Sequence, residues 1–230
     1  TVKSMYIHVI NSNSIPTSKH VWDVKVPLKI KVFMWFVHKQ VILTKDNLKK
    51  RNWTGPTRCS FCDRDETIKH LFFDCLLAKV LWQTVHIAFN IKPPNSVNAS
   101  FGTWLNGIPP DLAKHIRVGV CALLWTIWTC RNDLVFNRIL CIHFLQVIFR
   151  TTALIRLWSL LTLMEAREHL VTGSIRWEMV ARDIFNRFGW RSCNYLSLFC
   201  QPVVASFIWL VWLLALLALC ELLFIFIWRF

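Results

Sequence analysis

The sequence has few acidic residues. It contains 13 Asp and Glu against 27 Lys and Arg in 230 residues, which gives a formal net charge of +14 at pH 7. Such an excess of positive charge favours anionic partners, either nucleic acid or an acidic membrane surface. A solvated basic surface without a specific partner explains the composition equally well.

No signal peptide is expected, because residues 1–20 are polar and mixed in composition. Nine cysteines in a chain without a secretory signal argue against a disulfide framework, since disulfides persist in oxidising compartments. An odd number would leave one cysteine unpaired in any fully oxidised scheme. We therefore expect the nucleus or the cytoplasm, unless the chain is anchored to a membrane.

Apolar residues recur at helical spacing through most of the chain. After Pro27, the residues Ile30, Phe33, Met34, Val37 and Val41 define one helical face, although the alternation over 24–32 also fits a strand. Further helices are predicted over 45–51, 76–89, 111–136, 142–163 and 176–188, the first with Thr44 as N-cap and the last closed by Gly189. The predicted fold class is mainly α.

Residues 203–228 are 26 consecutive residues with a single charge, Glu221. This length exceeds the roughly 20 residues that cross a bilayer, so the segment is a candidate transmembrane helix. Four arginines lie between residues 176 and 191, whereas only Arg229 follows the segment, so the positive-inside bias would keep its N-terminal side in the cytoplasm. A gene-model artefact, such as read-through or a shifted frame, is the alternative.

Four potential metal ligands lie within 17 residues: Cys59, Cys62, His70 and Cys75. A C-x2-C turn places two thiolates on one side, and Zn²⁺ prefers four ligands in a tetrahedron and accepts a Cys3His set. Such a site is structural and leaves no coordination position for catalysis. Buried thiols and a core histidine are the alternative.

The last two ligands, His70 and Cys75, are five residues apart. An ideal helix would place them about 140° apart, so the chain is expected to break over 72–74, with a new helix beginning near Cys75. Leu71, Phe72 and Phe73 would then form a small core beside the metal.

Basic and aromatic residues are interleaved just before the cysteines. The candidate phosphate-binding residues are Lys45, Lys49, Lys50, Arg51 and Arg58, and the aromatic residues nearby are Trp22, Phe33, Trp35, Phe36 and Trp53. This mixture suits phosphate neutralisation together with base stacking. In the alternative, the aromatic rings belong to the core, which we favour for Phe33 and Phe36.

At these residues the chain resembles the zinc-binding domain that follows the polymerase in plant LINE-type (non-LTR) reverse transcriptases. The positions that carry the resemblance are Cys59, Cys62, Glu66, His70, Leu71, Phe72, Cys75 and Trp82, which match the pattern C..C...E...HLFf.C......W. The stretch LLWTIWTCRNDLVFN over 123–137 is similar to the "iW..RN...F" block that often follows. The likeness covers roughly residues 1–137 and implies a structural zinc ion and a role in binding RNA or DNA.

The resemblance also bears on activity. The family's polymerase lies upstream of this domain, and this chain has neither a YxDD-like carboxylate pair nor a carboxylate set of the ribonuclease H kind. We therefore expect no enzyme and no small-molecule substrate. The apolar C-terminal segment departs from the family pattern, and the chain looks like a stand-alone remnant of a retroelement.

The predicted organisation is an N-terminal segment over 1–20, the zinc-binding domain over 21–90, a helical extension over 99–200 and the candidate transmembrane helix over 203–228. The first functional hypothesis is a non-enzymatic zinc-binding module that binds RNA or DNA. The second is a tail-anchored membrane protein whose zinc module makes protein contacts, with the tail deciding the localisation.

Overall fold

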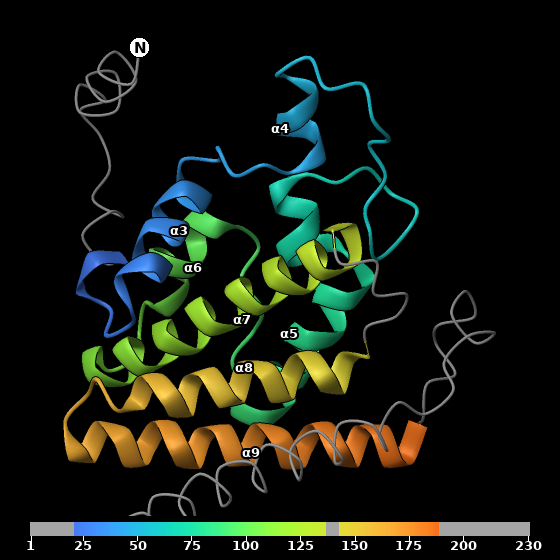
Figure 1. Cartoon of the computed structure of the whole chain (residues 1–230). Coiled ribbons are helices and arrows are strands. Elements are labelled where there is room, and N and C mark those ends of the chain that lie inside the picture. The colour runs from blue at the N-terminus through green and yellow to red at the C-terminus, as the bar shows by residue number, and fades with distance from the viewer. Residues whose placement is uncertain (1–20, 137–142, 189–230) are drawn as a thin grey trace, which may run out of the picture. The chain divides into compact units, whose positions relative to one another are not determined.

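Helices make up most of the described chain (Figure 1). The structure is a computed structural model, and it describes residues 21–136 and 143–188. Its elements are α3 (Leu28–His38), α4 (Lys45–Lys49), the π-helical turn η1 (His70–Asp74), α5 (Leu76–Phe89), α6 (Val97–Phe101), the 3-10 turn η2 (Thr103–Leu105), α7 (Pro110–Phe136), α8 (Phe144–Ser159) and α9 (Met164–Phe188). Within these residues the only β pairing is an isolated bridge between Arg58 and Asp65. The prediction of a mainly α fold is confirmed.

The ambiguous segment after Pro27 is a helix. Pro27 is the N-cap of α3, and four residues of the predicted apolar face are buried: Ile30, Phe33, Met34 and Val37. The fifth, Val41, lies beyond the end of the helix at His38 and is 41% exposed, which corrects the prediction. Phe33 meets the ring of Trp125 on α7 edge to face, with the ring centroids 5.0 Å apart. The prediction that Phe36 belongs to the core is wrong, because its side chain is 41% exposed. It lies four residues after Val32, on the face of α3 that points away from the core.

Helices α7, α8 and α9 form the largest helical layer. Figure 1 shows α8 and α9 running antiparallel, joined by the short connection over 160–163, with α7 crossing α8. The predicted helices at 111–136 and 142–163 are confirmed, the first to within one residue and the second to within four residues at its ends. Helix α9 begins twelve residues before the predicted start at 176, because the helix continues through Gly173. A Cβ atom at Gly173 would lie 3.7 Å from the ring of Phe89, so this side of α9 packs directly on α5.

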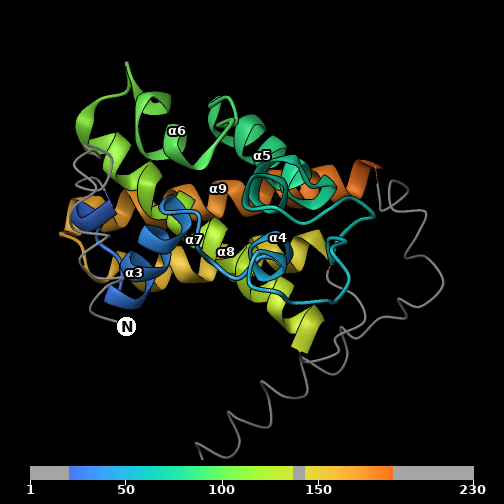
Figure 2. The same ribbon diagram turned by 90° about the horizontal axis from the view of Figure 1, so that it is seen from above.

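Helix α5 connects the cysteine-containing segment to the C-terminal helices, as Figure 2 shows from above. Its buried residues include Ala78, Leu81 and Trp82, whereas Leu76 at its first position is 48% exposed. The indole of Trp177 on α9 donates a hydrogen bond of 2.8 Å to Thr84 Oγ1 on α5. The described residues accordingly belong to one compact unit that extends to Gly189.

Among residues 21–136 and 143–188, no helix is both long and apolar enough to cross a membrane. The N-terminal segment over 1–20, the cap at Gly189 and the candidate transmembrane helix over 203–228 lie outside the described residues. The membrane anchor and the localisation that depends on it therefore remain predictions.

Candidate metal centre

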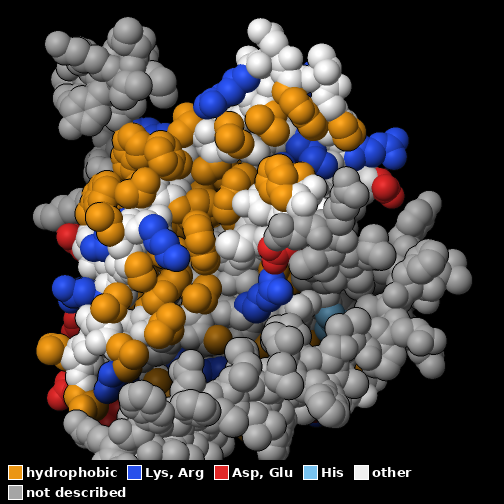
Figure 3. Space-filling view, in the orientation of Figure 1, with side chains coloured by type: hydrophobic (Ala, Val, Ile, Leu, Met, Phe, Trp, Pro, Cys, Tyr) orange, Lys and Arg blue, Asp and Glu red, His pale blue; other side chains and the backbone are white. Residues whose placement is uncertain are grey.

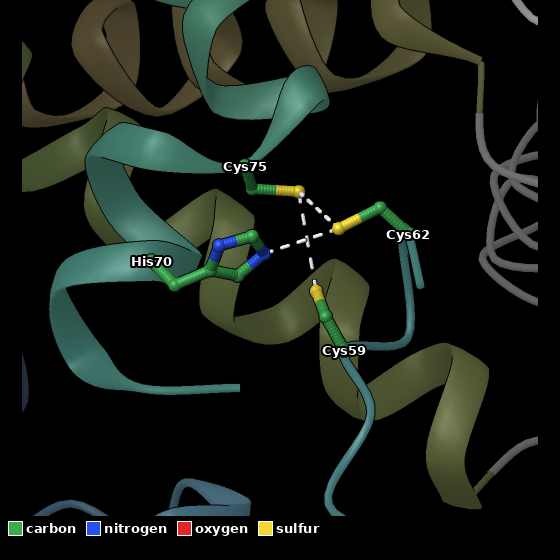
Figure 4. A group of neighbouring side chains, drawn as sticks. All are labelled: Cys59, Cys62, His70 and Cys75. Carbon is green, nitrogen blue, oxygen red and sulfur yellow. Dashed lines mark hydrogen bonds between the residues drawn. The ribbon is translucent and has the colours of Figure 1, made fainter. Parts of the chain in front are cut away.

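The four predicted ligands converge on one point (Figure 4). The Sγ atoms of Cys59, Cys62 and Cys75 and a ring nitrogen of His70 all lie within 4.8 Å of one another. Cys75 Sγ is 3.9 Å from Cys59 Sγ and 3.8 Å from Cys62 Sγ. A disulfide would need about 2.05 Å. A zinc–sulfur bond of about 2.3 Å gives a tetrahedral sulfur–sulfur edge of about 3.8 Å, so these separations fit thiolates around one zinc ion.

The first two ligands sit in a loop closed by backbone hydrogen bonds. The N–H of Cys59 donates to the carbonyl of Arg64 at 2.7 Å, and the N–H of Glu66 donates to the carbonyl of Thr57 at 2.9 Å. Inside the loop, the N–H of Phe61 points at Cys59 Sγ from 3.4 Å. An N–H aimed at the sulfur favours the thiolate form, which is the form that binds a metal.

The other two ligands are brought together by a change in helix type. The N–H of Cys75 donates to the carbonyl of His70 at 2.7 Å, which is the i→i+5 hydrogen bond of a π-turn. Cys75 then takes an extended conformation, with φ −62° and ψ 146°, and serves as N-cap of α5. The chain breaks at Cys75 itself rather than over 72–74, because those residues continue the π-helical turn. The new helix begins after Cys75 as predicted, and the predicted core is confirmed, because Leu71, Phe72 and Phe73 are buried. The wider turn lets residues five apart share one side.

Without a bound metal, the three thiols of the cluster differ in pKa. The hydrogen bond with Cys75 lowers the pKa of Cys59 to about 5. The same hydrogen bond, followed by burial, raises the pKa of Cys75, and burial raises that of Cys62. The cluster alone therefore favours one thiolate. A bound Zn²⁺ would deprotonate the other two, because coordination displaces thiol protons.

Donor chemistry and burial fit a structural zinc ion. Three sulfurs and one imidazole are a soft, tetrahedral donor set of the kind that zinc takes in closed sites. Cys59, His70 and Cys75 are buried, and Cys62 is partly exposed. His70 Nε2 lies 3.1 Å from Cys62 Sγ, a hydrogen-bond separation that would widen by roughly half an ångström around a metal. With four protein ligands in place, the ion would hold the loop rather than act on a substrate.

Sequence reasoning gave no role to Glu66, which is completely buried four residues before His70 in the chain. Its carboxylate pairs with Arg131 on α7, whose Nη2 lies 2.7 Å from Oε1 and whose Nε lies 3.2 Å from each oxygen. Oε1 also accepts the N–H of Lys45 at 3.0 Å, at the start of α4. Two signals were available: Glu66 and Arg131 both lie in the blocks that resemble the family, and an arginine in an apolar helical stretch requires a buried partner.

The five basic candidates divide into two kinds. The side chains of Lys49, Lys50, Arg51 and Arg58 are exposed. Figure 3 shows Lys and Arg side chains around α4 on the face of the molecule that is in view. Lys45 is partly buried, and its ammonium donates to the carbonyl of Arg58 at 2.5 Å and to Ser60 Oγ at 3.4 Å. Lys45 thus ties α4 to the cysteine loop, and the other four remain available to solvent.

Comparison with known proteins agrees with this geometry. Residues 1–82 match the family described as zinc-binding in reverse transcriptase. A protein of Arabidopsis thaliana named as a ribonuclease H protein is 29% identical over 65 residues, which cover 28% of this chain and 10% of that relative. The match thus spans about a tenth of the relative's length. No solved structure matches the chain. These two matches support a zinc-binding domain of the reverse transcriptase kind within residues 1–82.

Proposed function

We propose that the chain is a non-enzymatic, retroelement-related module that binds RNA or DNA, with Cys59, Cys62, His70 and Cys75 holding a structural zinc ion. The observation that carries the proposal is the exposed basic surface beside the cysteine loop, made by Lys49, Lys50, Arg51 and Arg58 and called here the α4 basic surface. The family match supports the zinc-binding part. The nucleic-acid part is supported by the position and sign of these charges.

The metal itself supplies no attraction for phosphate. Three thiolates and a divalent ion leave the centre with a net charge of about −1. The attraction comes from residues 45–58, where five basic residues face one acidic residue, Asp46. Asp46 lies 3.8 Å from the ammonium of Lys50, with which it forms an exposed ion pair. Exposed pairs of this kind are weak, so a phosphate can compete for Lys50.

Zinc and the α4 basic surface are coupled through short contacts. The N–H of Asp46 donates to the carbonyl of Glu66 at 3.2 Å, and Lys45 bridges to the residues on both sides of Cys59. Helix α4 has only five residues and is too short to be stable alone. Loss of the metal would therefore loosen α4 and spread the basic side chains, which lowers the affinity for nucleic acid.

The test is fluorescence anisotropy with short labelled RNA, single-stranded DNA and duplex DNA, across about 50 to 200 mM salt. The variant replaces Lys49, Lys50, Arg51 and Arg58 by Gln in the full chain. The matched control removes four exposed charges elsewhere, at Lys25, Lys79, Lys92 and Arg176.

We expect the wild type to bind with a steep salt dependence. The slope of the logarithm of the binding constant against the logarithm of the salt concentration should become shallower in the α4 variant. The change is about 0.7 to 0.9 for each phosphate that this variant no longer neutralises, and much less in the control. Equal reductions in both variants would assign binding to net charge alone. Binding that does not respond to salt would remove the mechanism. Affinities for the three nucleic acids would show which one is preferred.

A further inference from the structure

A cavity lies between α5, α7 and α9, away from the cysteine cluster. Its volume is about 250 Å³, and its lining is mostly apolar, with aliphatic side chains and the rings of Trp82, Trp104, Trp177 and Phe89. An apolar cavity of about 150 Å³ is large enough to take up benzene and otherwise stays dry. The cavity described here therefore has room for a two-ring aromatic molecule.

The indole N–H groups in the walls already have acceptors. Trp82 donates to the carbonyl of Phe72 at 2.8 Å, Trp104 to the carbonyl of Lys92 at 2.6 Å, and Trp177 to Thr84 Oγ1 at 2.8 Å. A ligand is therefore offered ring surfaces rather than donors in this part of the cavity. Ring surfaces favour an aromatic guest in stacked or edge-to-face contact.

Two glycines keep the cavity open. Gly119 on α7 and Gly173 on α9 both line it, and both lie inside helices, where Gly is destabilising relative to Ala. A Cβ atom at Gly119 would meet nothing closer than Ile155 Cδ1 at 3.9 Å, and one at Gly173 would meet Phe89 at 3.7 Å. A larger residue is sterically possible at both positions, and its side chain would occupy the space.

The polar end of the cavity is formed by two imidazoles. The rings of His115 and His169 lie 5.8 Å apart, and His169 is exposed, so the cavity opens to solvent on this side. Asp111 lies near His115, but its carboxylate is paired with Lys114 at 2.8 Å. An acidic ligand group at this opening would therefore meet imidazoles rather than an unpaired carboxylate.

We propose that this cavity binds a small two-ring aromatic acid, with its rings among Trp82, Trp104 and Trp177 and its acidic group at His115 and His169. The site shares no residue with the cysteine cluster or the α4 basic surface. It is independent of the proposed nucleic-acid function. The prediction that the chain has no small-molecule substrate concerns catalysis. The proposed site binds a ligand without a reaction, so the two statements are compatible.

The test is isothermal titration calorimetry of the detergent-free full chain with 2-naphthoate and with its neutral analogue 2-naphthylmethanol. We expect binding of one naphthoate per chain, and binding of the alcohol that is several-fold weaker. In Gly119→Leu the leucine fills the cavity, and naphthoate affinity should fall at least tenfold. In His115→Leu the preference for the acid over the alcohol should disappear.

Two readouts separate loss of the cavity from loss of the fold. The conservative variant Gly119→Ala should raise the thermal midpoint, because Ala favours the helix, while naphthoate binds more weakly. Salt-dependent nucleic-acid binding should be unchanged in both Gly119 variants. Absence of naphthoate binding to the wild type, or equal binding to the wild type and the Gly119 variants, would overturn the proposal.

Discussion

Glu66 and Arg131 form a buried ion pair that joins the cysteine loop to α7 across 65 residues of sequence. The exposed fractions of the two side chains are 0% and 3%, and the guanidinium also lies over the ring of Trp128, 5.2 Å from its centroid. Each charge depends on the other, because an unpaired buried charge is strongly unfavourable.

Replacement of one partner should therefore be severe. We expect Arg131→Met to lower the free energy of unfolding by about 3 to 5 kcal/mol, because it leaves the Glu66 carboxylate buried without its cation. The double variant Glu66→Leu, Arg131→Met should recover part of this loss. The control is Arg187→Met, which breaks the exposed pair with Asp183 and should cost less than about 1 kcal/mol. Urea unfolding measures all three, and equal effects at Arg131 and Arg187 would contradict this account.

A second prediction concerns pH and the start of α8. His143 is the N-cap, and its ring nitrogen Nδ1 accepts the N–H of Leu145 at 3.2 Å, which requires the neutral imidazole. Burial lowers the pKa of His143 to about 4, from an ordinary value of 6.5. Between these values the unfolded chain binds a proton that the folded chain does not. The contribution of His143 to the free energy of unfolding is therefore fully present above about pH 6.5 and is lost as the pH drops toward about 4.

The variant His143→Asn tests this directly, since Asn caps a helix without titrating. As the pH falls from about 7 to about 5, the free energy of unfolding of the wild type should decrease more than that of the variant. Taking the difference at each pH cancels any contribution from metal loss. A difference that is the same at both values would show that His143 does not control this dependence.

A third prediction concerns base stacking. Trp53 follows the α4 basic residues, is 38% exposed, and is held in place because its ring packs on Gly55. Trp53→Ala should weaken binding to single strands by about 1 to 3 kcal/mol and leave the salt slope unchanged, because stacking neutralises no phosphate. The control Trp22→Ala removes a ring that is 42% exposed before α3. Equal effects of the two variants in anisotropy titrations would argue against a stacking role for Trp53.

The sequence predicted the parts of the structure that depend on local pattern. Periodicity located α7 and α8, and the spacing of four ligands located the metal cluster. The chain break was predicted over 72–74 and lies at Cys75. Tertiary contacts explain what was missed. Helix α9 continues through Gly173 because the helix packs on α8 and α5, and Glu66 matters because Arg131 reaches it from α7. The cavity likewise depends on three helices whose packing no single segment encodes.

The central claim is that zinc holds the cysteine loop, and its most direct test is the zinc content of the purified full chain. By elemental analysis we expect about one zinc per chain in the wild type and in Cys121→Ser, which alters a buried thiol outside the cluster. Cys75→Ser and His70→Ala should lose both zinc and cooperative unfolding, and a chelator should do the same to the wild type. A wild-type chain that is folded without zinc would contradict the account.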